Sequence, residues 1–244
     1  MSNLKFTIAA CLLVVFGILV ASVAKAEELS YVDAPFGRVL VVVGAIELGT
    51  SSRIDAALTE DPTIENVGFH SGGGVAQEGF LIGNVLSKHG VTAIVPPGGV
   101  CLSACAIGFL GAKEYIVRGV LGFHNMYIPA EVTVNIEDLQ LLIIGQSFGV
   151  QTTAFFLANG FDVSLPMIIA NLTTPERFVI FTSTEDLMIF FARTEEDNVS
   201  GYLDGTEGVD NTWIETHLWG PEEFSAYFIA TQANPSKPNR STVK

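Results

Sequence analysis

The sequence predicts an α/β domain in which most strands pair in parallel. Short apolar runs rich in β-branched residues, typical of buried strands, occur at 39–43, 67–69, 92–95, 115–117 and 120–123. Most of these runs lead through a glycine-containing turn into a segment with helical character. We expect helices at 51–58, 77–89, 103–110 and 135–159, and another that starts near Ser164. This alternation of strand and helix is typical of parallel α/β folds.

Individual residues support the expected helix boundaries. Pro62 ends the first helix, and Gly90 is placed to cap the helix at 77–89 in the left-handed conformation. The carboxylate of Asp138 favours the start of the long helical stretch, and Pro166 is suited to the first turn of the next helix. The segment 103–110 consists mainly of small residues, so we expect it to pack closely against its neighbours.

The charge of the chain excludes some classes of partner. Its 244 residues include 26 acidic and 12 basic side chains, a formal charge of −14, although only 16% of the residues are charged. Such an acidic surface repels the phosphates of nucleic acids and anionic lipid headgroups, so we expect neither as a partner. The length suits one domain with a substantial core.

Residues 1–26 have the pattern of a cleavable signal peptide. Lys5 precedes an apolar stretch, and Ala24-Lys25-Ala26 matches the small-x-small motif of signal peptidase sites. Cleavage after Ala26 removes two lysines and changes the formal charge to −16. It leaves a domain at 27–232, a flexible polar tail at 233–244 and a periplasmic or secreted protein. The alternative is an uncleaved membrane anchor, since the apolar stretch is nearly long enough to span a bilayer.

Three segments that follow strands contain residues suited to catalysis. Ser71 begins a Ser-Gly-Gly-Gly-Val turn, which can expose backbone N–H groups to a ligand or can simply be a tight turn. Ser103 opens a helix behind a glycine-rich turn, where it is either a nucleophile with the Ala104 N–H as oxyanion donor or an ordinary helix cap. His124 ends a strand and is either a general base or a satisfied, partly buried side chain.

Cys101 and Cys105 lie on either side of Ser103. In an oxidising compartment they could form a disulfide that holds the turn around Ser103 rigid. Two buried free thiols and a metal site shared with His124 are the alternatives, although no further metal ligand lies nearby in the sequence. We favour the disulfide and expect neither a metal ion nor another cofactor.

In combination, these segments resemble the Clp protease proteolytic subunit within the Clp/crotonase superfamily. The resemblance extends from about Val39 to Leu187. The segments that carry it are Ser71-Gly-Gly-Gly-Val75, Glu78-Gly79, Ser103-Ala104, Gly111-Ala112-Lys113 and Gly122-Phe-His124-Asn125. It implies a spiral of β-β-α units with a protruding helical arm. It also implies homo-oligomers, for which the apolar residues of the arm at 135–159 would provide contacts.

The resemblance further implies a serine peptidase with Ser103 as nucleophile and His124 as base. The oxyanion hole would consist of the N–H of Gly72 or Gly73 together with that of Ala104. The orienting acid would be Glu176, although the family has Asp at this place.

Asp162 and Asp186 are the alternatives for the orienting acid. Export separates the chain from cytosolic ATP, so we expect an ATP-independent peptidase with no ATP-driven unfoldase as partner. The competing hypothesis is a non-catalytic binding protein that keeps the fold.

Overall fold

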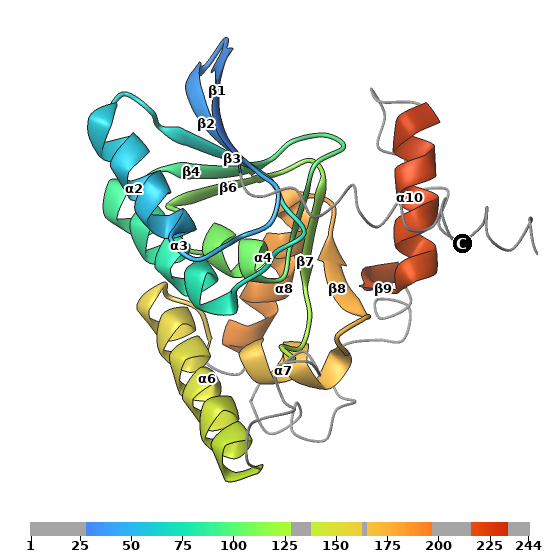
Figure 1. The fold of residues 1–244 in the computed structure, drawn as a ribbon. Coiled ribbons are helices and arrows are strands. Elements are labelled where there is room, and N and C mark those ends of the chain that lie inside the picture. Colours follow the sequence, from blue (N-terminus) through green and yellow to red (C-terminus); the bar gives the residue numbers. More distant parts are fainter. Residues whose placement is uncertain (1–27, 128–137, 163–164, 197–215, 234–244) are drawn as a thin grey trace, which may run out of the picture.

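The computed structural model describes residues 28–127, 138–162, 165–196 and 216–233. The predicted signal peptide and most of the predicted C-terminal tail lie outside these residues. The described part is a mixed α/β structure with two sheets (Figure 1). One sheet has the strand order β1 (Glu28–Ala34), β2 (Gly37–Val43), β3 (Asn66–His70), β4 (Thr92–Val95) and β6 (Glu114–Val117). The other has the order β5 (Val100–Leu102), β7 (Val120–Phe123), β8 (Phe178–Phe181) and β9 (Leu218–Trp219).

The predicted parallel pairing is confirmed at the centre of the fold. Strands β2, β3, β4 and β6 are parallel neighbours, and β5 is parallel to β7. The structure adds antiparallel pairs: β1 with β2 at the edge of the larger sheet, and β8 with β7 and β9 with β8 in the smaller sheet. The helices are α2 (Thr50–Glu60), α3 (Ala76–His89), α4 (Ala104–Phe109), α6 (Asp138–Ala158), α7 (Leu165–Leu172), α8 (Thr184–Glu196) and α10 (Pro221–Ala233).

Local sequence explains the central elements. In β2 the side chains of Leu40 and Val42 are fully buried, as expected for an apolar strand between two neighbours. Helix α3 ends where predicted, since Gly90 has φ 65° and its N–H donates to the carbonyls of Leu86 and Ser87. The main core lies where α2, α3 and α4 gather beside the larger sheet (Figure 1).

Helix α4 packs closely on α3, as the small residues of this segment predicted. A β-carbon on Gly79 would lie 2.5 Å from the carbonyl oxygen of Ala104, and one on Gly111 would lie 2.1 Å from that of Gly83. Only glycine permits such an approach of two backbones, so these positions fix α4 and the residue that precedes it. That residue is Ser103.

Helix α6 protrudes from the domain (Figure 1). Its C-terminal part is anchored in the core through Phe155 and Phe156, whereas five of its other large apolar side chains are exposed: Leu139, Leu142, Ile143, Val150 and Leu157. By length and composition alone the segment Leu139–Ala158 could cross a membrane, with a mean hydropathy of 1.5 and 11% of its residues buried. The helix predicted at 135–159 is therefore present from Asp138 to Ala158, and residues 135–137 lie outside the described part.

Candidate functional site

Ser103 and His124 lie together because their strands are neighbours. Ser103 directly follows β5 and His124 directly follows β7, and the two strands run in parallel. The ends of parallel neighbours meet at one edge of a sheet. The backbone N–H of Ser103 donates to the carbonyl of Gly122 at 2.9 Å, which locks the two strand ends together. The side chains meet with 2.7 Å between Ser103 Oγ and His124 Nε2.

Ser103 has a strained backbone conformation. Its φ of 57° and ψ of −122° are unusual, and it is the sole non-glycine residue with positive φ in the described part of the chain. Such a conformation costs about 1–3 kcal/mol and persists only when the surroundings impose it. The side chain makes no capping hydrogen bond to α4, so the alternative of an ordinary helix cap does not hold. The hydroxyl is directed to His124 instead.

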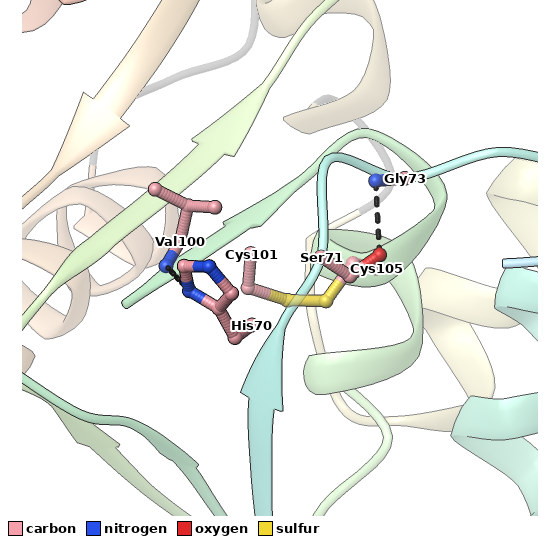
Figure 2. The surroundings of a disulfide bond; sticks show 6 residues. All are labelled: His70, Ser71, Gly73, Val100, Cys101 and Cys105. Atoms are coloured by element: carbon pink, nitrogen blue, oxygen red, sulfur yellow. Dashed lines mark hydrogen bonds between the residues drawn. A yellow bond between two sulfur atoms is a disulfide. The ribbon is translucent and has the colours of Figure 1, made fainter. Parts of the chain in front are cut away.

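A disulfide joins the residues on either side of this turn. Cys101 on β5 is bonded to Cys105 on α4, with 5.2 Å between their α-carbons, and both are fully buried (Figure 2). The bond links the strand before Ser103 to the helix after it. It also excludes a metal site formed by these two thiolates, because the sulfur atoms bond each other.

The glycine turn lies against Ser103. A β-carbon on Gly73 would lie 2.6 Å from Ser103 Cβ and 3.2 Å from the backbone nitrogen of Ala104. The N–H of Gly73 already donates to Ser71 Oγ at 3.1 Å (Figure 2). Of the expected oxyanion donors, the N–H groups of Gly72 and Ala104 therefore remain, since neither donates a hydrogen bond within the described residues. Gly72 is exposed and a β-carbon there would meet open space.

The environment of His124 keeps its imidazole neutral. Burial lowers the pKa of His124 below its ordinary value of 6.5, and the carbonyl groups of Pro175 and Thr174 partly offset this by raising it. A neutral imidazole with its proton on Nδ1 has Nε2 free to accept the proton of the Ser103 hydroxyl. The low pKa thus favours the form that can act as a base.

The structure does not bring the expected acid to this histidine. His124 Nδ1 is buried and has no hydrogen-bond partner among the described residues, so Glu176, Asp162 and Asp186 do not reach it. The side chain of Glu176 is exposed, on a turn closed by reciprocal backbone bonds between Thr174 and Arg177. The carbonyls of this turn face the imidazole, although neither meets hydrogen-bond geometry.

Sequence reasoning missed the aromatic partner of His124. The ring of Phe178 on β8 stacks on the imidazole with 4.3 Å between centroids and an interplanar angle of 27°. No signal in the sequence distinguishes this phenylalanine from an ordinary core residue of a strand.

Two of the other described histidines lie in different settings. His70 Nδ1 accepts a hydrogen bond from the N–H of Val100 at 3.3 Å (Figure 2), and His89 Nε2 lies 2.6 Å from Asp55 Oδ1. Within the described residues no three His, Cys, Asp or Glu side chains form a group able to hold a metal ion.

The site therefore consists of a serine–histidine pair with two available backbone donors beside it. Comparison with protein-family models and with curated proteins found no match to this chain.

Proposed function

We propose that this protein is an exported, ATP-independent serine hydrolase that cleaves peptides or proteins, with the spiral fold and helical arm of the Clp/crotonase superfamily. The observation that carries the proposal is the 2.7 Å separation between Ser103 Oγ and His124 Nε2, at a serine held in a strained turn. A nucleophile within hydrogen-bond reach of a base is the diagnostic arrangement for covalent catalysis. The distance favours this function over the non-catalytic binding protein.

The chemistry follows from the positions of these groups. His124 Nε2 accepts the hydroxyl proton while Ser103 Oγ attacks the substrate carbonyl, and the negative charge develops on the carbonyl oxygen. The N–H groups of Ala104 and Gly72 are the available donors for that oxygen. The protonated histidine then passes its proton to the leaving amine, and water hydrolyses the acyl-enzyme by the same route.

An extended peptide is the substrate best suited to the glycine turn. The carbonyl of Gly73 accepts from the N–H of Ile46, and the N–H of Val75 donates to the carbonyl of Ile46. These bonds pair one edge of the segment, whereas Gly72 and Gly74 are exposed and make no backbone hydrogen bond within the described residues. An unpaired strand edge binds extended peptides by adding them as a further strand.

The test is hydrolysis of a quenched fluorescent peptide mixture by the purified full-length chain. We expect cleavage by the wild type and none by Ser103→Ala or His124→Ala, with all three proteins folded by circular dichroism. A folded wild type that cleaves no peptide contradicts the proposal.

Among the described residues no carboxylate reaches His124 Nδ1, and this observation favours a second candidate, a binding protein without catalysis. In that case the peptide mixture would bind to the wild type and to Ser103→Ala equally, without turnover.

The proposed cellular setting rests on the sequence. We place the protein in the periplasm or outside the cell after cleavage behind Ala26, as a homo-oligomer. N-terminal sequencing of the exported protein and sedimentation of the mature chain test these two points. An N-terminus at Met1 or a monomer at all concentrations would contradict them.

A further inference from the structure

The contact made by the face of the His124 imidazole ring determines how this side chain is oriented. In serine hydrolases a carboxylate on Nδ1 usually holds the imidazole in place, but here Nδ1 has no such partner within the described residues. The closest stacking contact of the ring is Phe178, at 4.3 Å between centroids. A stacked aromatic ring restricts the tilt of the imidazole, and so restricts the direction of Nε2.

Phe178 is itself held by the C-terminal segment. The ring of Phe224 on α10 meets Phe178 edge-on, with 5.4 Å between centroids and an interplanar angle of 89°. Trp219 on β9 pairs with Phe178 across the strands and packs edge-on against Phe224 at 5.6 Å. Figure 1 shows α10 beside β8 and β9, at the edge of the smaller sheet.

The start of α10 is fixed relative to β9. The N–H of Gly220 donates to a carboxylate oxygen of Glu223 at 2.7 Å, and the N–H of Phe224 donates to the carbonyl of Gly220 at 3.2 Å. These bonds define the first turn of the helix, and with it the position of the Phe224 ring.

The same segment reaches the strand that leads to the nucleophile. Trp219 and Tyr227 form a second apolar cluster, separate from the main core, with Val100 of β5 and with Val120 and Ile180. Leu102, the residue before Ser103, packs against this cluster together with Phe178 and Phe224. The second cluster therefore packs against β5 and β7, the two strands that lead to Ser103 and His124.

The surroundings of Gly122 show how closely the side chains between β5, β7 and β8 are packed. A β-carbon there would lie 2.6 Å from a methyl group of Ile180, 2.6 Å from one of Leu102 and 3.4 Å from the ring of Phe178. Gly122 precedes His124 by two residues. The ring of Phe178 thus lies close to the backbone of the strand that leads to the histidine.

We propose that the C-terminal segment 218–233 is a positioning element of the site, in which Phe224 fixes the ring of Phe178 and Phe178 fixes the imidazole of His124 toward Ser103. The expected effect of this inference on the reaction rate rests on the proposed function, whereas the expected effect on the orientation of His124 does not. Phe178 and Phe224 are positioning residues, since neither touches the reacting atoms. Aromatic packing here takes over the role that a carboxylate has in the usual triad.

The experiment compares Phe224→Ala with Ile229→Ala in the full chain. Ile229 lies on the same helix and is 70% exposed, so its variant controls for changes in α10 that do not reach the site. The probe is an alkyl fluorophosphonate. Ser103 Oγ forms a bond to phosphorus as the P–F bond breaks, fluoride leaves and the hydroxyl proton passes to His124 Nε2.

We expect Phe224→Ala to lower the maximal rate of labelling at Ser103 by about 10- to 100-fold, the effect of a misplaced catalytic group. The concentration for half-maximal rate should change little, because the segment does not contact the probe. Phe224→Tyr, which keeps the ring, should restore the rate, and Ile229→Ala should label like the wild type. Equal rates in Phe224→Ala and the wild type, or equal losses in both alanine variants, overturn the inference.

A second readout does not require activity. In protein labelled with ¹⁵N-histidine, the Nε2 signal of His124 reports its hydrogen bond to Ser103. We expect this bond in the wild type and its loss in Phe224→Ala, without a change at His89. An unchanged signal in folded Phe224→Ala overturns the inference even if no protein labels. If the wild type fails to label but the signal responds as expected, the proposed hydrolase fails and the positioning role stands.

Discussion

Removal of the Cys101–Cys105 disulfide is expected to lower both the stability and the activity of the protein. The double variant Cys101→Ala/Cys105→Ala opens a loop between residues that are four positions apart. Loop-closure entropy gives about 2 kcal/mol for a loop of this size, which corresponds to a fall in Tm of about 4–8 °C. That energy is similar to the strain of about 1–3 kcal/mol at Ser103.

The stabilisation by the disulfide and the backbone strain at Ser103 are similar in size. Loss of the disulfide therefore allows Ser103 to relax toward negative φ in many of the folded molecules. The hydrogen bonds of its N–H to Gly122 and of its carbonyl to Ile107 oppose this change. If the whole 2 kcal/mol were lost from the active conformation, the maximal rate would fall by up to about 30-fold. We therefore expect a decrease of about 3- to 30-fold.

Thermal unfolding and peptide hydrolysis measure the two effects. The matched control is Ala106→Gly, which removes a buried methyl group from the same helix but leaves the disulfide intact. It should lower the Tm by a similar amount and leave the maximal rate nearly unchanged. The reasoning is refuted if the double variant unfolds at a lower temperature but keeps the full rate, because the disulfide would then not hold the nucleophile turn.

Three further predictions concern the surroundings of the site. Burial lowers the pKa of His124, so kcat/KM should fall at low pH with a midpoint below 6.5; a midpoint above 6.5 in a pH series would contradict this. Gly73→Ala places a β-carbon 2.6 Å from Ser103 Cβ at a φ of 97° and should reduce hydrolysis at least about tenfold, whereas Gly72→Ala meets open space and should keep most of it. Burial alone would raise the pKa of Glu78, but hydrogen bonds from backbone N–H groups at the start of α2 lower it. Glu78→Gln should therefore cost about 1–3 kcal/mol in urea unfolding at pH 7, and this difference should shrink as the pH falls below 4.5, where the carboxylate gains its proton.

The central strands and helices could be predicted because local sequence determines them. A run such as 39–43 is apolar at successive positions, and a capping glycine such as Gly90 marks a helix end on its own. Strand β1 was missed because it has no apolar face and is largely exposed, so its formation depends on pairing with β2. Strand β9 has only two residues, and it too is defined by its partner.

The serine and the histidine of the site could be predicted for a geometric reason. Each directly follows a strand, and neighbouring parallel strands bring their ends together whatever the intervening chain does. The place of Glu176 depends on the direction of the Thr174–Arg177 turn, which residue types do not reveal. Similarly, Phe178 has the pattern of a core residue, and only the packing of β8 beside β7 brings its ring to the imidazole.

The central claim is that Ser103 is a nucleophile activated by His124 without a carboxylate from the described part of the chain. Mass-spectrometric mapping of fluorophosphonate adducts on the full-length protein tests it most directly, with Glu176→Gln and His124→Ala alongside the wild type. We predict one adduct on Ser103, formed at the same rate in Glu176→Gln and lost in His124→Ala. A folded wild type without an adduct on Ser103, or an adduct whose formation requires Glu176, would contradict the claim.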